Sequence, residues 1–408
     1  MQHLFIPIPQ PDGVHSYSVF TPKDHPRSVP KWAAQKTNIL SVMNRMLVLV
    51  LASSLFCAAT NCVCAAEPMS EQEKAIAEIK RAGGRVTIDE KDPDKPVVEV
   101  LFDNTENRPT KLTDADMKSL KAFPKLQKLS LMGARNIGAI DVTDAGLENL
   151  VGLTQLQYLD LGGTKITDAG LANVAGLIQL KELHLNYTAI TGVGLVNLRN
   201  LSNLNTLHLV GSRTTGIGLA NLKQLANLRC LNVSRTQVND AALATIGELT
   251  QVRELWLTGT QITDAGLDNL KRMTNLQELN LHETNISDAG LQLIKGLTQL
   301  RKLGLISTQI TGAGLANLKG MSQLQMLDMR KTQITEAGLE NLTELAQLQR
   351  LNLDNTQITD AAVPILAKMT NLQYLYIYST KVTGAGVDKI KKALPSCHVA
   401  DKPPGGRP

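Results

Sequence analysis

A triplet of apolar residues returns every 24 residues along most of the chain. The first of these triplets is Leu156, Leu159 and Leu161, and the last is Leu372, Leu375 and Ile377. The second and third members are separated by one residue, so they point to the same face of a short strand. A fixed period of this length is typical of a solenoid, in which each unit buries its apolar side against its neighbours.

A short helix is predicted after each strand. The segment Thr167-Asp168-Ala169-Gly170-Leu171 recurs with small changes, for example from Thr263 and from Ser287. A hydroxyl followed by an acid is a helix start signal, and apolar residues then follow at steps of three. Each unit is therefore one strand, one tight turn and one short helix.

These units define the fold class. A connection through a helix to a parallel strand is almost always right-handed. Helices are wider than the spacing of about 4.8 Å between strands, so a stack of such units must curve. We therefore predict an α/β fold: a right-handed solenoid shaped like a horseshoe, with a parallel sheet on the concave face and short helices on the convex face.

A hydroxyl residue also recurs every 24 residues. The series is Thr164, Thr188, Ser212, Thr236, Thr260, Thr284, Thr308, Thr332, Thr356 and Thr380. Polar groups inside a repeat must be hydrogen-bonded. We expect these side chains to be buried, with each hydroxyl bonded to the backbone of an adjacent turn, so that the column fixes the register between units.

The pattern resembles the leucine-rich repeat, and the resemblance extends over residues 97–400. The helix opening is similar to the class with Cys at the recurring hydroxyl position, known from F-box-associated repeat proteins. Thr replaces that Cys here, so the chain looks most like the secreted leucine-rich-repeat proteins of bacteria. The resemblance implies a horseshoe that binds a protein or peptide, but it does not specify the ligand.

The stack has atypical ends. Residues 67–125 are predicted as an N-terminal cap with a helix at Glu71–Arg81, a strand at Arg85–Ile88 and one degenerate repeat with extra residues at 104–109. Residues 126–394 form the 24-residue repeats, with a further insertion at 135–141. Residues 395–408 give a capping strand and a disordered tail.

The N-terminal region indicates export. Residues 43–66 have a base at Arg45, then an apolar run, then small residues at Ala65 and Ala66, as in a signal peptide. Residues 1–42 before it are interpreted as a gene-model extension or a disordered segment. We expect a secreted, periplasmic or cell-surface protein; the alternative is an uncleaved membrane anchor.

Charge and cysteines add little. The net charge of +5 lies partly in residues 1–66, so the repeats give no electrostatic case for nucleic acid or anionic membrane. Cys230 and Cys397 are about seven repeats apart, too far to form a disulfide in a solenoid.

The sequence contains no motif for catalysis or for a cofactor. It has no phosphate-binding glycine loop, no paired-cysteine zinc spacing and no nucleophile elbow. His184 and His208 fall at the same position of adjacent strands and could hold zinc with Glu182 or Asp160, but two solvated imidazoles is the favoured interpretation. We therefore expect no enzyme activity, no catalytic residue, no cofactor and no metal.

Exposed strand positions are the part of each repeat that the leucine frame does not dictate. Between the buried leucines stand pairs such as Asp160 with Tyr158, and Cys230 with Asn232. Tyr, Trp and Arg are the favoured anchors of protein interfaces. The predicted partner-binding residues on the concave face are Tyr158, His184, His208, Trp256, His282, Arg330, Arg350, Tyr374, Tyr376 and Tyr378. The alternative for the three tyrosines is that they only shield the last strand from unwanted pairing.

Three functions remain. The favoured one is an exported, non-catalytic protein that binds a protein or peptide on its concave sheet. A ubiquitin-ligase-type adaptor resembling F-box repeat proteins would need a helical bundle before the repeats, and residues 67–125 are too short and strand-like for one. An enzyme would need a convergent acid, base and pocket on the concave face, which the sequence does not indicate.

Overall fold

The computed structural model describes residues 69–102, 112–132 and 141–402. The predicted signal segment at 43–66, residues 1–42, the insertions at 104–109 and 135–140, and the tail after 402 lie outside the described residues. The 24-residue repeats are almost entirely within them.

One sheet runs through the whole repeat region, and its strands follow one another in chain order. The strands are β1 (Arg85–Ile88), β2 (Val97–Leu101), β3 (Lys128–Ser130), β4 (Tyr158–Asp160), β5 (Glu182–His184), β6 (Thr206–His208), β7 (Cys230–Asn232), β8 (Glu254–Trp256), β9 (Glu278–Asn280), β10 (Lys302–Gly304), β11 (Met326–Asp328), β12 (Arg350–Asn352), β13 (Tyr374–Tyr376) and β14 (His398–Ala400). β1 pairs with β2 in antiparallel fashion, and every later neighbour is parallel. The predicted strands, including the capping strand, are confirmed.

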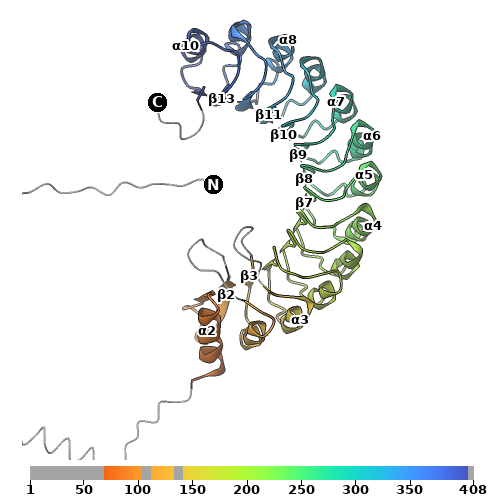
Figure 1. Cartoon of the computed structure of the whole chain (residues 1–408), viewed down its shortest axis with the longest axis vertical. Coiled ribbons are helices and arrows are strands. Elements are labelled where there is room, and N and C mark those ends of the chain that lie inside the picture. Colours follow the sequence, from red (N-terminus) through yellow and green to blue (C-terminus); the bar gives the residue numbers. More distant parts are fainter. Residues whose placement is uncertain (1–68, 103–111, 133–140, 403–408) are drawn as a thin grey trace, which may run out of the picture. The chain divides into compact units, whose positions relative to one another are not determined.

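Short helical turns connect the strands. The α-helices are α2 (Glu71–Arg81), α3 (Asp144–Leu147), α4 (Gly216–Leu219), α5 (Asp240–Ile246), α6 (Asp264–Leu267), α7 (Asp288–Ile294), α8 (Glu336–Leu339), α9 (Val363–Leu366) and α10 (Gly384–Ala393). The 3₁₀ turns are η1 (Asp116–Ala122), η2 (Glu148–Leu150), η3 (Gly170–Val174), η4 (Val193–Leu198), η5 (Ala220–Gln224), η6 (Asp268–Arg272), η7 (Gly312–Leu318), η8 (Glu340–Leu342) and η9 (Asp360–Ala362). Within the repeat region the strands lie on the concave side of the stack and the helical turns on the convex side (Figure 1). The predicted fold class is confirmed.

The core is a single thin layer between the sheet and the helical turns. The leucine triplets fill it, and Leu159, Leu161 and Leu171 are completely buried. At the N-terminal end, α2 covers the first repeat with Ile79, which is 1% exposed. A capping box between Ser70 and Glu73 holds the start of this helix.

The recurring hydroxyl residues from Thr164 to Thr356 are buried, as predicted, whereas Thr380 in the last repeat is only partly buried. The hydrogen bonds of these side chains differ from the prediction. Thr260 Oγ1 donates to the carbonyl of Leu257 at 2.6 Å, and Thr188 and Thr308 do the same with Leu185 and Leu305. The acceptor lies three residues earlier in the same repeat. These hydroxyls therefore close the turn after their own strand and do not bond one repeat to the next.

The aspartate of the helix opening links adjacent repeats instead. Asp288 Oδ1 accepts the backbone N–H of Thr311 at 2.8 Å, and its Oδ2 accepts the Thr311 hydroxyl at 2.6 Å. Asp240 binds Thr263 in the same way, 23 residues further along. The sequence predicted this acid only as part of a helix start.

That aspartate also explains the glycine of the motif. A Cβ on Gly314 would lie 2.2 Å from Asp288 Oδ1, and one on Gly290 would lie 2.4 Å from Asp264 Oδ1. Only a residue without a side chain fits beside the carboxylate of the preceding repeat. Where Gly312 replaces the acid, Gly338 of the next repeat packs directly on its backbone.

Candidate functional site

Two groups of side chains occupy the concave face of the sheet. The first group comes from β4, β5, β6 and β8. Tyr158 and His184 lie edge to face at 5.1 Å between ring centroids, and the His184 and His208 rings stack at 4.5 Å. Trp256 lies 5.7 Å from the ring of His208. The prediction that the two histidines are neighbours is confirmed.

Side chains at the first group are less exposed than the sequence predicted. Asp160, Cys230 and Asn232 are 3%, 8% and 4% exposed, although all three were assigned to open strand positions. His208 and Trp256 stand on either side of Asn232, and their rings close over this shorter side chain. Trp256 is itself half-buried, with its Nε1 buried and without a hydrogen-bond partner. The sequence assigned Trp256 to an exposed strand position, and the structure shows it half-buried.

Burial keeps His208 and Cys230 in this group uncharged at neutral pH. Desolvation, reinforced by His184, lowers the pKa of His208 to about 4, against a weaker opposing effect of Asp160. Desolvation, with Glu254 nearby, raises the pKa of Cys230 to about 12, so the side chain is a thiol and not a reactive thiolate. Among the described residues, no group of three or more potential ligands is placed to hold a metal ion.

The second group surrounds a hollow at β10. Gly304 stands where other strands carry a side chain, and the ring of His282 lies over it: a Cβ on Gly304 would be 2.3 Å from His282 Cε1. The hollow has a volume of about 270 Å³, and Met326 and Tyr376 contribute apolar surface to its lining. We call it the Gly304 hollow.

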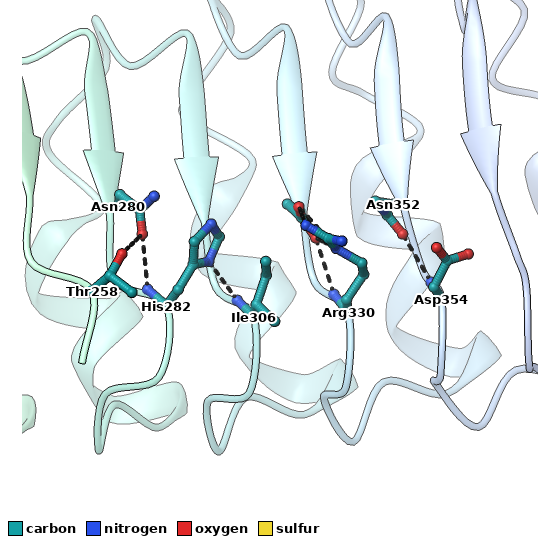
Figure 2. Close-up of polar contacts among 8 residues, drawn as sticks. Thr258, Asn280, His282, Ile306, Arg330, Asn352 and Asp354 are labelled. Carbon is teal, nitrogen blue, oxygen red and sulfur yellow. Dashed lines mark hydrogen bonds and ion pairs between the residues drawn. The ribbon is translucent and has the colours of Figure 1, made fainter. Parts of the chain in front are cut away.

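Hydrogen bonds across the strand ends hold the lining in place (Figure 2). Asn280 Oδ1 accepts the backbone N–H of His282 at 3.1 Å and the Thr258 hydroxyl at 2.8 Å. His282 Nδ1 accepts the backbone N–H of Ile306 at 2.9 Å, so the neutral ring carries its proton on Nε2. Burial lowers the pKa of His282, which favours this neutral form.

Arg330 belongs to the same hydrogen-bonded edge. Its Nε and Nη2 donate to the two carboxylate oxygens of Asp328, with Nη2 at 2.8 Å (Figure 2). That side-chain bond raises the pKa of Arg330. Asn352 Oδ1 accepts the N–H of Asp354, and Asp354 Oδ1 accepts the N–H of Tyr378. Each side chain is therefore fixed before any ligand binds.

A second hollow of about 450 Å³ continues towards β14. Arg330, Asn352 and Tyr376 line both hollows, so the two are contiguous. We call it the C-terminal hollow. Tyr378 lies in its lining and is 37% exposed. Arg350 lines the Gly304 hollow, and its guanidinium lies 4.6 Å from the ring centroid of Tyr374.

The ten residues predicted for partner binding thus separate into two groups. Tyr158, His184, His208 and Trp256 form the half-buried row at β4–β8. The other six lie at or beside the contiguous hollows. The sequence did not indicate either hollow, although Gly304 was a visible signal: it is the one strand position in the series without a side chain.

Comparisons with known proteins agree with this architecture. Residues 219–399 match the family model described as a leucine-rich repeat region, and residues 152–175 match a leucine-rich repeat model. The fold is a leucine-rich-repeat solenoid. The Cys-containing subclass named by the sequence resemblance is not distinguished by these matches. A search of curated proteins gave no match.

Solved leucine-rich-repeat structures resemble the chain at low identity. An internalin from Listeria monocytogenes is 21% identical, with a TM-score of 0.54, over 82% of this chain and 94% of that one. A plant peptide hormone receptor, RGFR1 in complex with RGF2, is 17% identical with a TM-score of 0.44, over 78% of this chain and 55% of the receptor. A leucine-rich-repeat protein of Leptospira interrogans is 17% identical with a TM-score of 0.39, over 71% and 93%. At these identities the likeness concerns the fold alone.

Among the residues that the structure describes, no helix is long and apolar enough to cross a membrane.

Proposed function

We propose that this leucine-rich-repeat protein is a non-catalytic binding protein that holds an extended protein or peptide segment across strands β9 to β14. The contiguous Gly304 and C-terminal hollows carry this proposal. Together they combine half-buried aromatic surface at Tyr376, an exposed Tyr378 and charged groups already fixed by hydrogen bonds. Preorganised Tyr and Arg side chains are typical anchors of protein interfaces.

The dimensions favour an extended polypeptide. Strands β9 and β14 are five neighbours apart in the sheet, or about 24 Å at normal strand spacing. An extended segment of about seven residues has this length, at about 3.3 Å per residue. A small metabolite would occupy only one of the two hollows.

We also propose that the protein is exported through the segment 43–66. The support is in the sequence: the charged start, the apolar run and the small residues at Ala65 and Ala66. Fractionation of the source cells and N-terminal sequencing would test it. A protein found intact in the cytosol, with residues 43–66 retained, would contradict export.

The binding proposal can be tested by photocrosslinking. A photoreactive phenylalanine analogue at Tyr378 should crosslink to the partner in the source cells, and mass spectrometry would identify it. The same probe at Lys271, on η6 of the convex side, is the control and should give no specific product. Equal products from both positions, or none from Tyr378, would contradict the concave face as the site.

Tyr376→Ala should then weaken binding of that partner by about 2 kcal/mol or more, the scale of an interface hot spot. Tyr376 projects from the sheet away from the leucine core, so the variant should remain folded. Isothermal titration calorimetry would measure the change, with Lys271→Ala as the matched control. Unchanged affinity in Tyr376→Ala would place the contact elsewhere.

A further inference from the structure

The Gly304 hollow carries more positive than negative charge. Its charged lining residues are Lys302, Arg330 and Arg350 against Glu278 and Asp328. Both carboxylates are already paired, because Lys302 Nζ lies 2.8 Å from Glu278 and Arg330 Nη2 lies 2.8 Å from Asp328. Among the described residues, no carboxylate lies within 4.0 Å of the Arg350 guanidinium.

Arg350 is held in a defined position although it lacks an anion. Its guanidinium rests beside the ring of Tyr374, and its backbone is in the middle of the sheet, paired with Met326 and Tyr374. A planar guanidinium placed in this way presents several N–H donors in a fixed geometry. A bound segment that covers the guanidinium without supplying an anion removes the charge from water with nothing to compensate it, which disfavours binding. The surface therefore selects for a segment with an acidic group.

A second donor stands in the same hollow. His282 carries its proton on Nε2, because Nδ1 accepts the Ile306 N–H at 2.9 Å. The Cβ position of Gly304 is only 2.7 Å from that Nε2, so the N–H lies over the strand where the hollow is open. Arg350 and His282 both line this hollow, so it offers one charged donor and one neutral donor.

We infer that the Gly304 hollow binds an acidic side chain, Asp or Glu, of the extended segment, with Arg350 as its ionic partner and His282 as a neutral hydrogen-bond donor. The inference rests on the proposed function and specifies one position of its ligand. A side chain fits better than a chain terminus, since the hollow continues past Arg330 and Tyr376 into the C-terminal hollow and the bound backbone can pass through.

A positional-scanning library of heptapeptides, acetylated and amidated at the ends, tests this inference on the full chain. The wild type should select Asp or Glu at one position by roughly tenfold or more over Asn or Gln, as expected for a charge-assisted bond. Arg350→Gln should abolish that preference and leave the preferences at other positions unchanged. Arg272→Gln, on the convex η6, is the matched control and should keep every preference.

The outcomes separate this inference from the proposed function. Peptides selected without any acidic preference, or an acidic preference that survives Arg350→Gln, would overturn the inference and leave the binding function standing. Selection of peptides only when the carboxy terminus is free would also overturn it, in favour of a terminal carboxylate. A wild type that selects no peptide in either library would overturn the proposed function together with the inference.

Two controls concern the Arg350 variants themselves. Circular dichroism would show that Arg350→Gln is folded. Arg350→Lys, which keeps the charge, should restore part of the preference for an acidic residue.

Discussion

At the scale of single residues, burial on the concave face determines which side chains can ionise. His208 is enclosed by His184, Cys230 and Trp256, and its pKa falls to about 4 in the folded protein. An unfolded chain returns the imidazole to about 6.5. Between these two values the unfolded state binds more protons than the folded state, so stability falls as the pH falls.

We therefore expect the contribution of the neutral His208 ring to the free energy of unfolding to be complete above pH 6.5 and to decrease towards pH 4. Allowing for the partial solvent exposure of the ring, the free energy of unfolding should drop by about 1 kcal/mol between pH 7.5 and pH 5 because of this residue. Urea unfolding at both pH values would measure the drop, which should be smaller by that amount in His208→Gln. The same drop in wild type and His208→Gln would contradict the assignment.

The sequence predicted the burial of some side chains correctly and of others wrongly, depending on what determines their surroundings. The leucines and the recurring hydroxyl residues from Thr164 to Thr356 were predicted correctly as buried, because the repeat fixes both their position and their neighbours. Asp160 and Asn232 were not, because their burial depends on which large side chains happen to stand on adjacent strands. Alternation along a strand specifies the side of the sheet, and cross-strand neighbours specify the exposure.

At the scale of the repeating element, the helix opening also bonds one repeat to the next, a role that its sequence did not reveal. By composition its Asp is part of a helix start, yet it bonds the Thr of the following repeat and faces the Gly of that repeat. A single-sequence pattern cannot distinguish the two roles, since a period of 24 residues places both partners in every unit. The turn after each strand shows a similar ambiguity. Its left-handed residue is Gly at 163, 211 and 259, but Tyr187, Glu283 and Lys331 adopt the same conformation.

Asp288→Ala should lower the free energy of unfolding by about 1–3 kcal/mol, because the N–H and the hydroxyl of Thr311 both lose a charged acceptor. Gly314→Ala should also destabilise, since the added Cβ meets Asp288 Oδ1. In the Asp288→Ala background the same Gly314→Ala change should be much less harmful. Urea unfolding of the four proteins as a double-mutant cycle measures this coupling.

Asp268→Ala is the control for that cycle. Among the residues that the structure describes, Asp268 pairs only with Lys271, at the exposed convex surface, so its loss should change stability by less than about 0.5 kcal/mol. If the effects of Asp288→Ala and Gly314→Ala on the free energy of unfolding were additive, the carboxylate would not be the reason that position 314 requires glycine.

At the scale of the whole molecule, cohesion comes from contacts between neighbouring units. Within the described residues, each strand pairs only with the strands before and after it, and the Asp of each helix opening bonds the next repeat. Stability in such a stack is approximately the sum of the repeats and of the interfaces between them. The proposed binding surface has a different origin, because the two hollows arise where particular repeats depart from the common frame, above all at Gly304.

Removal of one whole repeat, residues 261–284, should therefore leave a shorter folded solenoid. In the intact chain Asp240 bonds Thr263 and faces Gly266. The deletion places Ser287 and Gly290 at these two positions, so Asp240 again meets a hydroxyl and a glycine. Removal of residues 261–272 alone takes out half a period, so Asp240 no longer meets its partners and the leucines of the next strand leave the core. Urea unfolding followed by circular dichroism should show one cooperative transition for the 24-residue deletion and a broad, early one for the 12-residue deletion. Equal loss of cooperativity in both would mean that the repeat is not the unit of stability.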